Sequence, residues 1–245
     1  MQNVFFDTAK TFLLDLLFPV ECFGCGIAGT YLCAPCFAKL PLQELFICPV
    51  CEKPSFEHAV CVECTKRTKL DGLIAASFYD IALLRRLIFA YKYKFVKPLA
   101  LPLSQLIVKC LTLHNHSLFH RNDLVLVPVP LSKRRERWRG FNQAREIAVL
   151  LGKALQISLC DNALFRTRNT VPQIEAVSRK ERFENIRGAF KVADPLQIKN
   201  KTILLVDDVA TSLATLNECA RVLKGAGAKE VWGIVVAREY VKKEN

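Results

Sequence analysis

A pair of adjacent carboxylates ends an apolar run and is followed by a turn rich in hydroxyl groups. Asp207 and Asp208 close the run ILLVDD, and the next residues, VATSLAT, lead into a segment with helical spacing. The hydroxyls of Thr211, Ser212 and Thr215, with the unpaired amide groups of a first helical turn, favour an anion such as phosphate. The two carboxylates can accept hydrogen bonds from ribose hydroxyls or help to hold Mg²⁺. The alternative interpretation is an acidic pair that only caps the turn and the helix.

Eight of the eleven cysteines form four pairs, each with two intervening residues. The pairs are Cys22/Cys25, Cys33/Cys36, Cys48/Cys51 and Cys61/Cys64. Such a pair aims two thiolates at one tetrahedral metal ion, and two pairs complete a four-sulfur zinc site. The alternatives are a disulfide framework and a thioredoxin-like redox pair. A disulfide framework is typical of secreted proteins, and we expect no secretion signal here; a redox centre needs only one cysteine pair, not four. We therefore favour two structural zinc ions.

The order in which the pairs share zinc is left open by the spacing. Consecutive pairs that share a metal give two ribbons, whereas pairs one and three that share a metal give a cross-brace. The gap of seven residues between Cys25 and Cys33 suits a compact ribbon. Because eight thiolates fill both sites, no coordination position is left for a substrate, and we expect the zinc to supply folding energy.

Five cationic side chains crowd into seven positions of the segment SKRRERWRGFNQ, together with two aromatic rings. The cations are Lys133, Arg134, Arg135, Arg137 and Arg139, and the rings are Trp138 and Phe141. Arginine forks grip phosphate oxygens and rings stack on bases, so this mixture suits a single nucleic-acid strand or a pyrophosphate. The alternative is a solvated basic loop with its rings in the core. We favour ligand contact, because crowded cations repel one another unless an anion is present.

The charge balance of the whole chain agrees with a phosphorylated partner. The 245 residues carry a formal net charge of +12, and 14 basic against 6 acidic side chains lie between 132 and 191. Charge kept for solubility is the alternative explanation. The apolar run FLLDLLFP near the start is short and contains Asp15. We therefore expect a cytoplasmic protein without membrane insertion, with an N-terminal amphipathic helix over residues 1–20 that packs on the chain itself.

Apolar runs and helical spacing alternate after the cysteine pairs. The runs predict strands at 73–79, 123–130, 202–208 and 230–237, and the spacing predicts helices at 81–90, 98–113, 142–155 and 212–225. Continuous apolar strands separated by helices indicate an α/β fold, with a mainly parallel sheet covered by helices on both faces. Ligands bind at the carboxyl ends of such strands, which is where Asp207 and Asp208 are expected.

Five segments of the sequence carry a resemblance to a known family. The segment ILLVDDVATSLAT resembles the phosphoribosyl-pyrophosphate motif of type I phosphoribosyltransferases. With VPVPLSKRRERWRGFNQAREIA, FRTRNTVPQ and ERFENIRGAF, and with YKYKFVKPLA, the chain resembles the ComF competence family from about Phe18 to Arg238.

The resemblance implies an architecture and a set of site residues. It implies a double zinc-ribbon module at 21–68 before an amidophosphoribosyltransferase-like domain at 69–245. Asp207 and Asp208 would bind the ribose hydroxyls or the metal ion. If the protein transfers the phosphoribosyl group, these two residues would be its catalytic residues. The loop Thr211, Ser212, Leu213, Ala214 and Thr215 would hold the 5-phosphate. Arg166, Arg168, Thr170 and Gln173 would belong to a mobile loop that closes over the site. Lys92 and Lys94 either extend the basic face or are ordinary helix-end lysines.

The family also implies a role in natural transformation, in which single-stranded DNA is handled in the cytoplasm beside a helicase-like partner. We therefore expect binding of phosphoribosyl pyrophosphate with Mg²⁺, and of single-stranded DNA. A true phosphoribosyltransferase with an unknown acceptor, and a zinc-dependent scaffold with a vestigial pocket, are the alternatives.

Leu213 departs from the family pattern, which usually has glycine at this position. A leucine held at positive φ costs about 1 to 2 kcal/mol. Leu213 also precedes the helical stripe of Leu216, Cys219 and Leu223, so its side chain is expected to turn inward. We expect a retained phosphate site of weakened affinity, which Leu213→Gly would strengthen.

Overall fold

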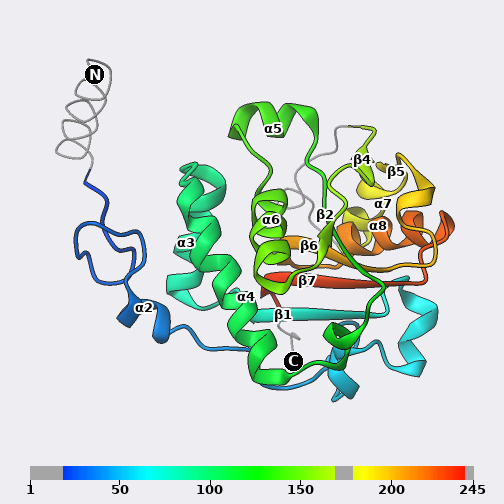
Figure 1. Ribbon diagram of the computed structural model, residues 1–245, viewed down its shortest axis with the longest axis horizontal. Coiled ribbons are helices and arrows are strands. Elements are labelled where there is room, and N and C mark those ends of the chain that lie inside the picture. Colours follow the sequence, from blue (N-terminus) through cyan, green and yellow to red (C-terminus); the bar gives the residue numbers. More distant parts are fainter. Residues whose placement is uncertain (1–18, 169–178, 241–245) are drawn as a thin grey trace.

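The computed structural model describes residues 19–168 and 179–240. Its centre is a parallel sheet of five strands in the order β1-β7-β6-β2-β3 (Figure 1). The strands are β1 (Gly72–Phe78), β2 (Leu124–Pro128), β3 (Ser158–Leu159), β6 (Thr202–Ala210) and β7 (Glu230–Arg238). The expected mainly parallel sheet is therefore confirmed, and β6 lies inside it between β7 and β2.

Helices cover both faces of the sheet, as the apolar runs of its strands require. On one face lie α3 (Ala82–Tyr93), α4 (Ala100–His114) and α6 (Gln143–Leu155), in one apolar core with Ile74, Leu204 and Ile234. On the other face, α8 (Ala214–Gly225) packs in a second core. A small antiparallel pair, β4 (Leu164–Arg166) and β5 (Phe190–Val192), and the helix α7 (Arg179–Ile186) complete this side.

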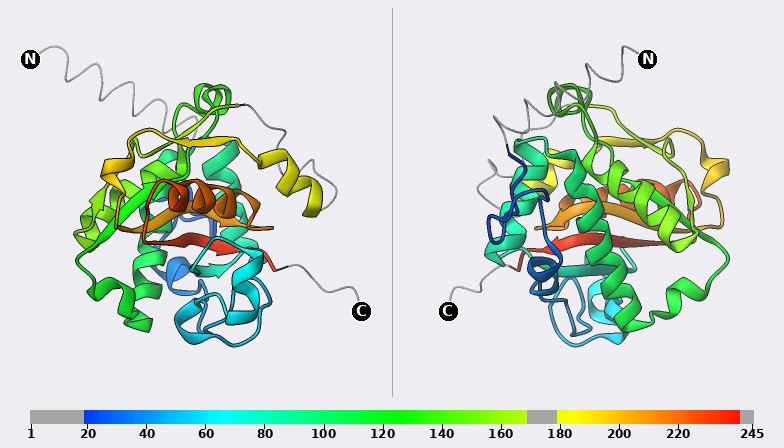
Figure 2. Two further views of the ribbon diagram at one scale, coloured as in Figure 1. Left: turned by 90° about the vertical axis from the view of Figure 1, so that its right-hand side faces the viewer. Right: turned by 60° about the vertical axis from the view of Figure 1, so that its left-hand side comes forward.

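The cysteine-rich segment forms two separate lobes around the sheet domain. The first ribbon contains α2 (Ala34–Ala38) and lies beside α3, as Figure 2 shows in blue. Its rings Phe23, Tyr31 and Phe37 pack against the core that α3 and α4 share with the sheet. The second ribbon contains the short 3-10 helices Phe56–His58 and Val62–Arg67, and it lies beside β1. The predicted helix at 1–20 falls almost wholly outside the described residues.

Direct hydrogen bonds tie the second ribbon to the sheet. The amide of Val60 donates to Asp71 O at 2.7 Å, and Ala59 forms an antiparallel bridge with Gly72. Arg238, buried at the end of β7, donates through Nη2 to Pro49 O at 2.7 Å. The second ribbon is thus built into the sheet domain.

Three histidines line the contact between the second ribbon and α4. His58 is buried, its ring lies 5.7 Å from that of His114, and His116 Nε2 lies 2.7 Å from Glu57 O. Burial, and then the charges of the nearby His114 and His116, lower the pKa of His58 to about 4 against the opposing charge of Glu57. Burial also lowers the pKa of His116. The contact therefore favours the neutral forms of His58 and His116.

The second ribbon should loosen in acid. Between the ordinary pKa of His58, 6.5, and its folded value of about 4, the unfolded chain binds more protons than the folded one, so the free energy of unfolding decreases as the pH is lowered. The loss reaches about 3 kcal/mol below that window. Thermal melting between about pH 7.5 and 4.5 should show this slope, and His58→Gln should flatten it. An equal slope in His58→Gln would remove His58 as the cause.

Candidate functional site

The acidic pair lies near the carboxyl end of β6, as expected for a ligand site in a parallel sheet. Asp208 is buried, and its Oδ1 lies 2.7 Å from Nζ of Lys92 in the last turn of α3. The amide of Asp208 donates to Asp207 Oδ1 at 2.9 Å. One carboxylate is therefore held by a cation from another element, while the other faces the cavity described below.

Burial and neighbouring charges shift the pKa values of Asp207 and Lys92. Burial, together with the charge of Asp208, raises the pKa of Asp207 to about 7 against the opposing charge of Lys92. Burial by itself would lower the pKa of Lys92, but Asp208 and Asp207 raise it instead. Burial thus favours the neutral form of Asp207, whereas an arriving cation or hydrogen-bond donor would favour its ionised form.

The turn after β6 has the conformation that glycine usually supplies. Leu213 has φ +66° and ψ 0°, in the left-handed region, and its carbonyl accepts from the amide of Asn217 at 2.8 Å as α8 begins. Its side chain is only 4% exposed and belongs to the core under α8, with Leu216 and Leu223. The expected inward turn of Leu213 is therefore what the structure shows. Because the backbone already has the left-handed geometry, the leucine does not reshape the turn.

The arginine-rich segment is a helix rather than a loop. Its seven residues form α5 (Lys133–Arg139), where the amide of Arg135 donates to Ser132 Oγ at 3.4 Å and Gly140 ends the helix at φ +76°. Arg134, Arg135 and Arg139 line the cavity, whereas Arg137 is exposed and donates through Nε to Lys133 O.

The two aromatic rings of this segment differ in their exposure to solvent. Phe141 is buried, with its ring centroid 5.4 Å from that of Tyr91, so its expected role in base stacking is wrong. Trp138 remains 59% exposed and lines the cavity. The difference follows from their positions, because Trp138 lies on the short helix and Phe141 follows the glycine that turns the chain back toward α6.

The second arginine block is divided between the site and the scaffold. Arg166, at the end of β4, lines the cavity with its guanidinium carbon 5.3 Å from the centre of the Phe190 ring. Burial, and then the charge of Arg135, lower the pKa of Arg166 to about 10. Arg168 does not line the cavity; it donates to the backbone carbonyls of Asn185 and Arg187. Thr170 and Gln173 lie outside the described residues.

One cavity of about 980 Å³ joins these parts of the chain. Around it lie Asp207, Asp208, Thr211, Leu213, Ala214 and Thr215 from the β6–α8 region, with Lys92, Arg134, Arg135, Arg139 and Arg166. Ser212 is buried in the same turn, and its Oγ accepts from the amide of Ala214 at 3.4 Å. Carboxylates at one wall and arginines at another suit a ligand that has both hydroxyls and phosphates.

Sequence reasoning missed the position of Lys92. The structure also adds Tyr79, Arg182 and Glu239 to the cavity wall. Helical spacing could have indicated Lys92, because it follows the buried Ile88 by four residues and so shares the inward face of α3. Its pairing with Asp208, by contrast, joins residues far apart in the sequence.

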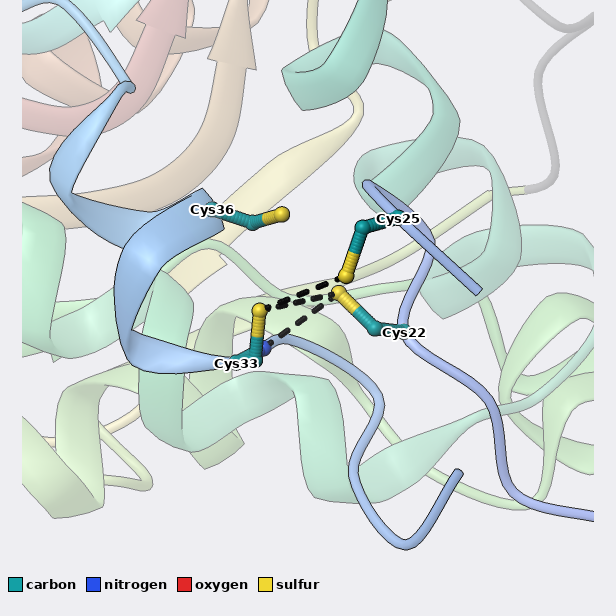
Figure 3. A group of neighbouring side chains, drawn as sticks. All are labelled: Cys22, Cys25, Cys33 and Cys36. Carbon is teal, nitrogen blue, oxygen red and sulfur yellow. Dashed lines mark hydrogen bonds between the residues drawn. The ribbon is translucent and has the colours of Figure 1, made fainter. Parts of the chain in front are cut away.

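The eight paired cysteines form two four-sulfur clusters from consecutive pairs. Cys22, Cys25, Cys33 and Cys36 form the first cluster, and Cys48, Cys51, Cys61 and Cys64 form the second, each with sulfurs within 4.8 Å of one another. The sulfurs of the first cluster converge in Figure 3. The two-ribbon alternative is therefore the correct one, and the cross-brace is excluded.

The geometry of both clusters fits zinc. The sulfur of Cys33 lies 3.6 Å from those of Cys22 and Cys25, and the Cys51 and Cys61 sulfurs are 3.7 Å apart. A tetrahedral zinc ion about 2.3 Å from each thiolate separates the sulfurs by about 3.8 Å. Burial alone would raise the pKa of Cys22, but the amides of Cys33, Cys25 and Gly24 lower it to about 6. Such amides stabilise the thiolate that a metal needs.

Gly24 is required by the close approach of the two cysteine pairs. A side-chain carbon at this position would lie 2.4 Å from the sulfur of Cys36. The first pair can therefore approach the second only where the intervening residue has no side chain.

None of the helices in the described parts of the chain is long and apolar enough to cross a membrane.

Comparisons with known proteins match both parts of the chain. The family "Double zinc ribbon domain" matches residues 13–68, and the family "Phosphoribosyl transferase domain" matches residues 139–245. The DNA utilization protein YhgH of Escherichia coli K12 is 30% identical over 206 residues, covering 82% of this chain and 88% of that protein. Competence protein ComFC of Bacillus subtilis is 31% identical over 207 residues, covering 80% of this chain and 78% of that protein.

A third relative aligns over a shorter length. Competence protein F of Haemophilus influenzae is 36% identical over 115 residues, which is 46% of this chain and 50% of that protein. The three relatives, the two family matches and the two-part architecture agree, and the chain belongs to the ComF family of competence proteins.

Proposed function

We propose that this protein binds phosphoribosyl pyrophosphate, or a related phosphorylated sugar, together with single-stranded DNA, and that it acts in DNA uptake in the cytoplasm. The observation that carries the proposal is that the acidic pair, the hydroxyl-rich turn and five arginines line one cavity. The names of the curated relatives, which refer to competence and DNA utilization, support the biological setting.

Each part of a phosphoribosyl pyrophosphate molecule would contact a different group of residues in the cavity. The turn from Thr211 to Thr215 opens α8, whose first amides and dipole favour the 5-phosphate. Asp207 and Asp208 accept hydrogen bonds from the ribose hydroxyls. The pyrophosphate meets the arginines of α5 and Arg166, which bind phosphate oxygens in bidentate fashion.

Mg²⁺ fits the same wall. Magnesium is commonly held by one or two carboxylates and by phosphates of the substrate, and Asp207 presents a carboxylate to the cavity while Lys92 holds Asp208. When bound, the ion would neutralise part of the pyrophosphate charge. The arginines and Lys92 orient the ligand and add positive charge around it.

Transfer of the phosphoribosyl group to an acceptor is a second candidate. The cavity volume of about 980 Å³ lies at the upper end of the range found for sites of drug-sized ligands, about 300–1,000 Å³, so an acceptor has room beside the sugar. Release of pyrophosphate with a panel of nucleobases and amines would support transfer. Binding of phosphoribosyl pyrophosphate without such release would leave a binding protein.

Loss of the acidic pair should remove sugar binding but not the fold. For Asp207→Asn with Asp208→Asn, we expect calorimetric affinity for phosphoribosyl pyrophosphate with Mg²⁺ to fall at least about 100-fold, because two charge-assisted hydrogen bonds are lost. The proposal requires that the wild-type protein gives measurable heat when phosphoribosyl pyrophosphate and Mg²⁺ are added. No heat for the wild type would instead indicate a scaffold with a vestigial pocket.

A second set of variants tests the nucleic-acid half of the proposal. Replacing Arg134, Arg135 and Arg137 with alanine should weaken single-strand binding and lower its logarithmic salt slope by about 0.7 for each lost phosphate contact. Lys153→Ala, an exposed charge on α6 away from the cavity lining, is the matched control. Binding that is absent, or independent of salt, would contradict this half.

A further inference from the structure

Four aromatic rings gather beside the cavity and leave much of their surface exposed. Trp138 is 59% exposed, Phe89 51% and Phe95 39%, while Tyr93 lines the cavity. Their ring centroids follow one another at 5.0 Å from Phe89 to Tyr93, 6.5 Å from Tyr93 to Trp138, and 5.1 Å from Trp138 to Phe95. Isolated apolar side chains are common on surfaces, but a connected row of large rings indicates a binding surface.

One residue of this row, Phe95, has an unfavourable backbone conformation. Phe95 follows α3 with φ +57°, a left-handed conformation that costs a bulky residue free energy. This turn sets the ring of Phe95 edge-on to Trp138, with an interplanar angle of 84°. A residue held in an unfavourable conformation so that its ring stays at the surface is better explained by binding than by packing.

Cations are interleaved with the rings. The guanidinium of Arg139 lies 5.4 Å from the centre of the Tyr93 ring and 5.9 Å from that of Trp138. Arg85, one turn before Phe89 on α3, and Lys94 are exposed. No ion pair holds either of them among the described residues. The helix α5 contains five cationic side chains and one carboxylate, that of Glu136.

We infer that Phe89, Tyr93, Phe95 and Trp138 form a base-stacking platform for single-stranded DNA beside the sugar-phosphate cavity. The inference rests on the proposed function and assigns residues to its DNA half. Rings that alternate with cations match a strand that offers a base and a phosphate at each nucleotide. A free base would cover one ring and leave the others exposed, so the length of the row favours a strand. The carboxyl end of α3 and the helix α5, which carry the row, lie side by side through these ring contacts (Figure 1).

The platform predicts that binding depends on the bases as well as on the phosphates. We expect Phe89→Ala and Trp138→Ala each to weaken binding of a labelled oligothymidine strand by roughly tenfold, with an unchanged salt slope. Trp138→Phe, which keeps a ring, should retain most of the affinity. An abasic strand of equal length should bind the wild type weakly and be insensitive to the ring substitutions. Phe89→Ala should bind phosphoribosyl pyrophosphate like the wild type, because Phe89 lies outside the cavity lining.

Tryptophan fluorescence provides a second readout. Of the two tryptophans, Trp232 is buried, so quenching on addition of oligothymidine reports Trp138 and should disappear in Trp138→Phe. If the wild type binds the strand and both alanine variants bind it equally well, the platform is wrong while the proposed DNA binding stands. If the wild type binds no strand, the DNA half of the proposed function and the platform fall together.

Discussion

Replacement of Cys48 by serine should release the zinc of the second ribbon and destabilise the sheet domain with it. Cys48 is fully buried, its sulfur accepts from the amide of Cys61 at 3.4 Å, and it belongs to the second four-sulfur cluster. Structural zinc contributes on the order of 10 kcal/mol to the folding of such small units. Without it, the ribbon cannot hold Pro49 under Arg238, whose buried guanidinium then loses that acceptor. We expect one zinc per chain instead of two, and a melting temperature lowered by several degrees.

The first ribbon supplies the matched control. Cys25 is exposed and belongs to the other cluster, in a lobe that contacts the domain through side-chain packing. Cys25→Ser should also remove one zinc, yet leave melting of the sheet domain close to that of the wild type. Hydrogen exchange would localise the difference, with loss of protection in β1 and β7 only for Cys48→Ser. Equal melting of the two variants would show that the second ribbon does not support the sheet.

The second large effect is expected at Leu213, where the conformation and burial of the side chain favour a different result from the one expected from the sequence. A glycine there would relieve about 1 to 2 kcal/mol of left-handed strain. It would also delete a buried leucine side chain, for which truncations cost about 2 to 5 kcal/mol. Because the turn already has φ +66°, glycine offers the phosphate no new backbone geometry. We therefore expect Leu213→Gly to lower the free energy of unfolding by about 1 to 3 kcal/mol without tighter binding of phosphoribosyl pyrophosphate.

Chemical denaturation and calorimetry on the same samples separate stability from affinity. Leu213→Asn is the informative companion, since asparagine tolerates left-handed φ but cannot fill the apolar site. It should lose stability like glycine, which would assign the loss to the missing side chain. A glycine variant that binds the sugar phosphate at least tenfold more tightly would restore the original interpretation, in which the leucine impairs the site.

Sequence reasoning performed best where burial alone decides the structure. The runs that became β2, β6 and β7 each have a continuous apolar stretch, because strands inside a two-sided parallel sheet touch helices on both faces. The acidic pair could be placed at the strand end for the same reason. The cysteine pairs indicated the metal but not the pairing order, because their spacing permits both arrangements, and only the folded chain brings Cys33 to Cys25.

The features that the sequence did not predict also have physical explanations. The helix α5 is a charged segment with no apolar stripe, although Ser132 before it and Gly140 after it are the usual helix boundaries. The short strands β4 and β5 depend on pairing with each other, which local propensity does not reveal. The ion pair between Lys92 and Asp208 depends on how α3 packs against the sheet, which no local pattern records.

The attachment of the second ribbon has one more consequence, for solubility. β1 lies at the margin of the five-stranded sheet, and β7 pairs with it on one side. On its other side the cysteine-rich part of the chain supplies partners: Gln43 donates to Ala76 O at 2.9 Å, and Ala59 bridges Gly72. An uncovered margin strand recruits strands from other molecules. The second ribbon covers part of this edge through Ala59, so we expect loss of its zinc to expose β1 to intermolecular strand addition and the protein to aggregation.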